Sequence, residues 1–146
     1  MILAIDPGSA KTGIALVNED GSLGKKDIIP TEALENLAAA WAKTGEARLI
    51  VMGNGTHHKE LRKRVEEGLK DADLPLPIVF VDEKYTTEMG KERYWKDHPA
   101  KGISRLIPKG MRTIPVPVDD YVAWIIGEIY LGTVEAESVR HEKIRN

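Results

Sequence analysis

The sequence predicts a three-layer α/β fold with a mixed five-stranded sheet flanked by helices. Three strand-like segments come first, and the turn-forming pair Asp20-Gly21 separates the second from the third, which indicates antiparallel pairing. After residue 30, helical and strand-like segments alternate, as they do where a helix connects two parallel strands. A sheet that begins antiparallel and continues parallel is mixed.

Short apolar segments bounded by turn residues locate the strands. The five strands are expected at residues 2–6, 13–18, 25–29, 48–53 and 77–83. The last segment is an almost unbroken apolar run, which is typical of a strand covered on both faces. We therefore expect 77–83 to be a central strand.

Apolar residues at helical spacing locate four helices. The first is expected to begin at Thr31, whose hydroxyl is placed to cap it. The second carries an apolar stripe from Leu61 to Leu69, the third covers 85–97, and the last begins at Val118. Three strands followed by helix–strand–helix–strand–helix is the element order of the RNase H-like fold, which also resembles half of an actin-type ATPase.

Length and composition indicate one domain. The 146 residues suit a single core, expected at 1–132, with a basic loop rich in Pro and Gly at 98–117 and a polar tail at 133–146. Cysteine is absent, which excludes disulfides and thiolate metal sites. Without a signal-like start or an apolar run near the roughly 20 residues that a membrane span needs, we expect a cytoplasmic protein.

The charge distribution leaves nucleic-acid binding open. A net charge of −2 argues against a protein that binds nucleic acid by its overall charge. Basic residues nevertheless gather at 59–64 and recur from 84 to 112. Such local patches can serve a nuclease whose own carboxylates lower the total.

Three carboxylates are placed to share one site. Asp6 and Glu83 end predicted strands, and side chains at strand ends converge on the crevice where α/β folds place their sites. The third acid is Asp119 or, as second choice, Asp120. On a helix, Asp119 falls on the apolar face that we expect to pack on the sheet, the face of Val122, Ala123, Ile126, Ile129 and Tyr130.

Clustered carboxylates repel one another and need a hard cation, and oxygen ligands select Mg²⁺ or Mn²⁺. Two such ions activate a water and stabilise the leaving oxygen of a phosphodiester. Each acid also has an ordinary explanation by itself, as a turn residue, a solvated strand end or a helix cap. Those three explanations must hold together to account for all three positions, so the metal site is the better hypothesis.

At these residues the chain resembles the YqgF family, also called RuvX, of ribosomal RNA precursor processing nucleases, which are relatives of the RuvC Holliday junction resolvases. The resemblance spans about residues 2 to 131. RuvC-like resolvases carry their glutamate at the end of the fourth strand, where this chain has Gly53-Asn54, and this favours YqgF. The matching motifs are at 6–15 (DPGSAKTGIA), 81–87 (VDEKYTT) and 118–130 (VDDYVAWIIGEIY).

The resemblance implies a metal-dependent endonuclease that hydrolyses phosphodiester bonds in structured nucleic acid, with pre-16S rRNA processing as its task. Its partners would be an RNA precursor or branched DNA, and ribosomal particles. Its metal ligands and catalytic residues would be Asp6, Glu83 and Asp119. Lys11, Thr86 and Thr87 would contact the substrate, although an ordinary exposed lysine and helix-capping threonines explain them equally well.

Other residues favour structural roles. His57 and His58 are expected to be solvent-exposed rather than metal ligands. Tyr94 and Trp95 are expected in the core rather than stacked on bases. The alternative functions are a Holliday junction resolvase-like DNA nuclease, a non-catalytic RNA- or ribosome-associated module, and an actin-type nucleotide-binding module whose turn at 8–13 would hold phosphate.

Overall fold

The computed structural model describes residues 1–55, 57–84, 86–99 and 117–133. Within these ranges one sheet has the strand order β3-β2-β1-β4-β5. Its strands are β1 (Ile2–Asp6), β2 (Lys11–Val17), β3 (Leu23–Pro30), β4 (Ile50–Gly53) and β5 (Ile78–Val81). β2 runs antiparallel to β1 and β3, whereas β4 and β5 run parallel to β1. The predicted mixed five-stranded sheet is confirmed.

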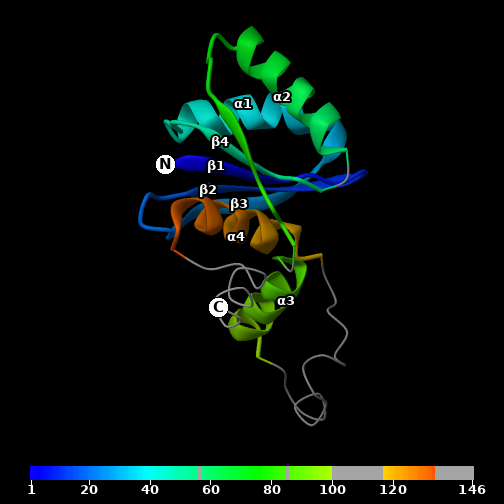
Figure 1. Ribbon diagram of the computed structural model, residues 1–146, viewed down its shortest axis with the longest axis vertical. Helices are drawn as coiled ribbons and strands as arrows, with labels where there is room; N and C mark the ends of the chain where they lie inside the picture. Colours follow the sequence, from blue (N-terminus) through cyan, green and yellow to red (C-terminus); the bar gives the residue numbers. More distant parts are fainter. Residues whose placement is uncertain (56, 85, 100–116, 134–146) are drawn as a thin grey trace, which may run out of the picture.

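Helices cover both faces of the sheet, as predicted for a three-layer fold (Figure 1). They are α1 (Leu34–Thr44), α2 (His58–Asp71), α3 (Thr86–Asp97) and α4 (Asp119–Leu131). α1 and α2 pack against each other on one face, α4 packs on the other, and α3 packs mainly on α4. No helix in the described residues is both long enough and apolar enough to cross a membrane.

β1 joins the two apolar layers of the core. Leu3 and Ile5 point into the cluster under α1 and α2, whereas Ile2 and Ala4 point into the cluster under α4. This alternation follows from the two-residue period of a strand, and all four residues are fully buried. The end of β1 is therefore held rigidly from both sides.

The prediction that 77–83 is a central strand is wrong. β5 lies at the edge of the sheet, and all four of its residues are only half-buried. Side chains of α2 cover part of it: the ring of His58 meets that of Phe80 edge-on at 5.0 Å, and the guanidinium of Arg62 lies 5.5 Å from the same ring. The apolar sequence of β5 therefore indicates that the faces of this strand are covered. It does not indicate that the strand has a neighbouring strand on each side.

Two details of the helices also differ from prediction. Thr31 does not cap α1, since it begins a short 3-10 turn before the helix and its hydroxyl bonds elsewhere. On α4, Ile129 is half-buried and Tyr130 is 37% exposed, so neither packs on the sheet as expected. Tyr121 and Ile125 are buried instead. For Tyr121 the reason is α3, which covers a second side of α4, as the edge-on contact between the Tyr94 and Tyr121 rings shows.

α4 ends at Leu131, and the following Gly132 adopts a left-handed conformation (φ 76°). The domain boundary expected at residue 132 stays a prediction. The basic loop predicted at 98–117 lies outside the described residues from 100 to 116. The polar tail predicted at 133–146 lies outside them from 134 onward.

Candidate functional site

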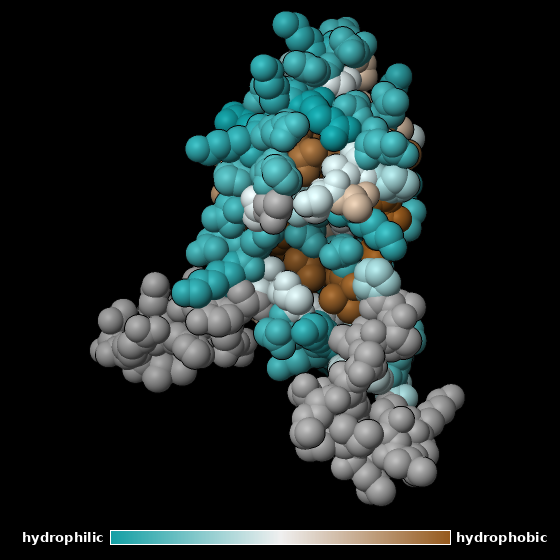
Figure 2. Space-filling model, turned by 90° about the vertical axis from the view of Figure 1, so that its right-hand side faces the viewer, coloured by the Kyte–Doolittle hydropathy of each residue, from teal (hydrophilic) through white to brown (hydrophobic). Residues whose placement is uncertain are grey.

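The structure brings the three predicted carboxylates to one end of the sheet. Asp6 is the last residue of β1, Glu83 follows β5 by two residues, and Asp119 is the first residue of α4. β1, β4 and β5 are parallel, so their carboxyl ends meet at this edge. Figure 2 turns this end of the molecule toward the viewer, and hydrophobic side chains reach the surface there between strongly hydrophilic ones.

Asp6 and Glu83 form the centre of the cluster. Their carboxyl groups lie close enough to act on each other, and burial together with the repulsion between them favours a proton on the pair. Burial, followed by the charges of Glu83 and Asp119, raises the pKa of Asp6 to about 8. Burial also raises the pKa of Glu83. The site therefore holds protons at neutral pH that isolated carboxyl groups would release.

The carboxylate of Glu83 lies against the loop that follows β4. A β-carbon on either Gly53 or Gly55 would overlap a carboxylate oxygen of Glu83, so the two glycines leave the space that this carboxylate occupies. Between them, Asn54 accepts a hydrogen bond from the backbone N–H of Glu83 through its side-chain oxygen, at 3.2 Å. Glu83 thus reaches across the end of β4 from the neighbouring strand. We call residues 53–55 the glycine cradle.

The start of α3 fixes the backbone of Glu83. The hydroxyl of Thr86 donates to the Glu83 carbonyl at 2.5 Å, and the Thr86 N–H donates to the same oxygen at 3.0 Å. Thr86 is 1% exposed, so its hydroxyl is used inside the protein and does not face a substrate. Thr87 is exposed. Of the two predicted substrate contacts, only Thr87 is in a position to make one.

Asp119 comes beside Asp6 because of a third glycine. Gly13 pairs with Asp6 in the β1–β2 ladder, and a β-carbon on Gly13 would overlap the backbone carbonyl of Asp119. The absence of a side chain lets the first turn of α4 approach the sheet at this point. Burial, and next the charge of Asp120, raises the pKa of Asp119, while the ammonium of Lys11 opposes the rise. Lys11 is exposed.

The structure separates the roles of the two neighbouring aspartates on α4. Asp120 points away from the cluster and forms an ion pair with Lys26 of β3 at 2.5 Å. The same ammonium lies 3.9 Å from the centre of the Tyr121 ring. Asp119 alone of the pair adds its charge to Asp6. The geometry therefore favours Asp119 as the third acid of the cluster.

The topology decides the fold family. An antiparallel β1–β2–β3 meander extended by two parallel strands, with helices on both faces, is the arrangement predicted from the element order. The fold is RNase H-like. The three acids lie at the carboxyl end of its parallel strands, as the sequence predicts.

Comparisons with solved structures found likenesses at low similarity, including these two. RuvC from Thermus thermophilus is 11% identical with a TM-score of 0.48, and the match covers 92% of this chain and 97% of that one. A ROK family glucokinase from Streptomyces griseus, in complex with glucose and AMPPNP, is 18% identical with a TM-score of 0.41. That match covers 64% of this chain, which spans only 36% of the glucokinase. No family model and no curated protein matches the sequence.

The three predicted metal ligands lie at the same end of the sheet. In the described residues, no three His, Cys, Asp or Glu side chains are placed to hold one metal ion. The donors nevertheless fit a hard divalent cation, since Asp6 and Glu83 already touch and Asp119 adds a third negative charge. One oxygen of Glu83, Oε2, is buried and has no hydrogen-bond partner among the described residues. A buried, unpaired carboxylate oxygen is costly and suits a cation.

The histidines and aromatic residues differ in their agreement with prediction. His57 is exposed, as expected, and lies 3.8 Å from Glu60. His58 is half-buried: its Nδ1 bonds the Gly55 carbonyl at 2.9 Å, and its ring lies close enough to influence Glu83. The prediction of an exposed His58 is therefore wrong. Tyr94 is in the core and Trp95 packs against it half-buried, as expected.

Sequence reasoning found the acids but missed what positions them. The missed residues are Gly13, the glycine cradle and His58. A signal for the cradle was present, since two glycines flank Asn54 at the end of a strand. Its meaning depends on a residue thirty positions away, so the motif alone does not disclose it.

Proposed function

We propose that the protein is a divalent-metal-dependent endonuclease that hydrolyses phosphodiester bonds in structured nucleic acid. The observation that carries this proposal is the close pair of Asp6 and Glu83, whose carboxyl groups act on each other within the field of Asp119. Three buried or half-buried carboxylates in one place are unfavourable unless protons or cations balance their charge. Few other groups of the protein bind these carboxylates, so the carboxylate oxygens are left for metal ions.

In this proposal Asp6, Glu83 and Asp119 hold Mg²⁺ or Mn²⁺, with two ions as the expected number. Such ions supply an activated water and neutralise charge on the phosphodiester. The protein supplies position: β1 fixes Asp6, the glycine cradle and Thr86 fix Glu83, and the first turn of α4 fixes Asp119. Lys11, exposed and close enough to influence Asp119, is placed to attract the substrate backbone.

We further propose an RNA precursor, in particular pre-16S rRNA, as the substrate, and ribosomal particles as its setting. The support is the resemblance of the motifs at 6–15, 81–87 and 118–130 to the YqgF family. Branched DNA is the competing substrate, because the fold is RNase H-like and a RuvC structure is among its distant likenesses. Geometry at the acids favours neither, since phosphodiesters of both nucleic acids present the same atoms.

A cleavage assay with matched variants tests the proposal. A structured RNA bearing a 16S precursor end and a four-way DNA junction are incubated with Mn²⁺ and with wild type, Asp6→Asn or Asp120→Asn protein. We expect the wild type and Asp120→Asn to cleave the RNA faster than the junction, and Asp6→Asn to be inactive. Equal cleavage by wild type and Asp6→Asn would reveal a contaminating nuclease and overturn the proposal, and preference for the junction would transfer the proposal to DNA.

A melting experiment separates the nuclease from a nucleotide-binding module. Millimolar Mn²⁺ alone is expected to raise the melting temperature, because it binds only the folded acid cluster. Added ATP is expected to contribute nothing further. Stabilisation that required ATP would favour the actin-type alternative.

A further inference from the structure

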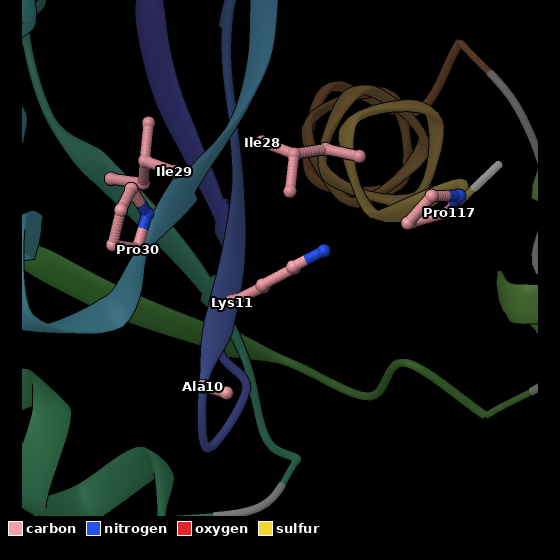
Figure 3. A pocket seen from close by; sticks show the side chains of 6 residues that line it. All are labelled: Ala10, Lys11, Ile28, Ile29, Pro30 and Pro117. Carbon is pink, nitrogen blue, oxygen red and sulfur yellow. The ribbon is translucent and has the colours of Figure 1, made fainter.

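A cleft of about 460 Å³ opens beside the acid cluster. Its size falls in the range of about 300–1,000 Å³ that is usual for small-molecule sites. Figure 3 shows it between β3 and the start of α4, with the side chain of Lys11 extending into it from β2. The residues that line it are Ala10, Lys11, Ile28, Ile29, Pro30 and Pro117.

The chemistry of the cleft is uniform except at one point. Ile28, Pro30 and Pro117 present aliphatic surface. Among the described lining residues there is no carboxylate, and Lys11 brings the one charge. The Lys11 side chain is exposed and forms no ion pair within the described residues, so its ammonium, which acts on the neighbouring Asp119, can also meet an anion. An apolar slot with a single cation at its edge matches a nucleotide, which has a flat base at one end and a phosphate at the other.

The position of the cleft connects it to the proposed chemistry. Lys11 and Ala10 follow the turn that leaves Asp6, and Pro117 precedes Asp119 by two residues. The ammonium of Lys11 also acts on Asp119 from the side of the cleft. A chain whose phosphate lies at the acids therefore has its neighbouring nucleoside within reach of this slot.

We propose that this cleft, which we call the Lys11 cleft, binds the unpaired nucleoside adjacent to the scissile phosphate. The proposal rests on the proposed nuclease function and adds its substrate class: a strand with at least one base outside a helix. A paired base cannot enter the slot, because its partner and its stacked neighbours hold it in the duplex. Contact with aliphatic side chains reads no base identity, so the cleft selects unpaired structure and not sequence.

A nucleic acid is favoured over a protein segment as the occupant by charge. A nucleotide brings one phosphate to the single ammonium of Lys11 and a neutral base to the apolar surface, whereas an acidic peptide brings charge to the apolar surface as well. One nucleic-acid strand can thus be bound at two points, with its scissile phosphate at the acid cluster and the neighbouring nucleoside in the Lys11 cleft.

The first test is a titration followed by the methyl NMR signal of Ile28, using full-length protein in buffer without divalent metal. Adenosine 5′-monophosphate is the probe, and ribose 5-phosphate is its control without a base. We expect the Ile28 methyl to shift with the nucleotide and not with the sugar phosphate, and Ile129, half-buried on α4 and outside the cleft, to stay unchanged. Equal shifts from both compounds, or none, would overturn the proposal.

The second test uses an oligonucleotide in which a single abasic site is moved along the strand, with binding measured by fluorescence anisotropy. The measurement uses Asp6→Asn protein, so that the oligonucleotide is not cleaved while binding is measured. We expect one abasic position to weaken binding about tenfold, the change that about 1.4 kcal/mol produces. Ile28→Trp, which fills the slot, is expected to abolish this dependence, whereas Ile129→Trp keeps it.

If the abasic position has no effect on binding and the wild-type enzyme is active, the cleft proposal is rejected and the nuclease proposal is kept. A positional dependence with an inactive wild type would keep the cleft as a binding site and reject the nuclease.

Discussion

The carboxyl groups of Asp6 and Glu83 act directly on each other although their strands are not neighbours in the sheet. β4 separates β1 from β5, and Glu83 reaches over its end where Gly53 and Gly55 leave room. An acid from an edge strand thus occupies the place that an acid on β4 would otherwise take. The site is assembled from the ends of two strands and one helix, so its function depends on how each end is held.

The first prediction separates the adjacent aspartates of α4. Asp119→Asn is expected to reduce cleavage by about a thousandfold, because it removes a charge that the proposed metal ions need. Asp120→Asn is expected to retain activity and to cost at most about 1 kcal/mol of stability, since it breaks a single partly exposed ion pair with Lys26. Initial cleavage rates and urea unfolding measure the two effects. Greater loss of activity in Asp120→Asn would reverse the assignment.

The second prediction concerns pH. Burial and two neighbouring carboxylates raise the pKa of Asp6 from 3.8 to about 8. Between about pH 4 and about pH 8, the folded protein therefore keeps a proton that the unfolded chain has released, and the free energy of unfolding falls as pH rises. Without metal, the melting temperature should decline across this window. Divalent metal replaces the proton, so its stabilising effect should grow with pH.

Two variants test this titration. Asp6→Asn is expected to flatten the decline, because the group that binds the proton is gone. Asp20→Asn is the control: hydrogen bonds from Ser22 lower the pKa of Asp20, which stays ionised across the window in both states. Melting curves from about pH 5 to about pH 8, with and without Mg²⁺, provide the measurement. A metal-free stability that rises with pH in the wild type would contradict the protonated pair.

The main features of the fold could be predicted because each follows from local pattern. Apolar alternation and helical spacing located the strands and helices, and the turn at Asp20-Gly21 is present, with φ of +89° at Gly21. The edge position of β5 could not be predicted, because side chains of α2 cover Phe80 much as a neighbouring layer would. The periodicity of apolar residues indicates how far a residue is covered, but it does not indicate which element covers it.

The candidate site, like the fold, could be predicted in part from the sequence. Strand ends converge by topology, so the placement of Asp6 and Glu83 at one edge followed from sequence. The glycines that position the acids could not be predicted, because the need for space at Gly13 arises only when α4 docks. Likewise, the hydroxyl of Thr86 was expected at a substrate, and its bond to the carbonyl of Glu83 appears only in three dimensions.

The third prediction concerns a buried hydroxyl pair beneath the β1–β2 turn. Thr31 donates to the Gly8 carbonyl at 2.8 Å, so Thr12, 2.8 Å away, donates to Thr31. Thr31→Val should cost about 1–3 kcal/mol of unfolding free energy, because it leaves the Thr12 hydroxyl buried without a partner. The double variant Thr12→Val/Thr31→Val should be no less stable than Thr31→Val. Chemical denaturation of the single and double variants measures this coupling, and strictly additive losses would refute it.

The fourth prediction concerns the glycine cradle. In Gly53→Ala or Gly55→Ala, the new methyl group would overlap the carboxylate of Glu83, which must then move away from Asp6. Because displaced or badly oriented ligands bind metal poorly, we expect apparent Mn²⁺ affinity to fall by about 10- to 100-fold in either variant. Affinity is measured from the rise in melting temperature with metal concentration. Gly24→Ala is the matched control, because Gly24 is exposed at the end of β3 that lies away from the acids, where the new methyl group would meet the end of the Met1 side chain and the Leu16 carbonyl.

Rescue distinguishes a lost metal ligand from general damage to the fold. Shortening the acid by one methylene group withdraws its oxygens from the new methyl, so Gly55→Ala/Glu83→Asp should recover part of the metal response that Gly55→Ala loses. A purely structural role for Gly55 predicts the opposite, since the second substitution then adds its own cost. If Gly53→Ala and Gly55→Ala keep the wild-type metal response, the cradle does not position Glu83, and the edge-strand acid must reach the site in another way.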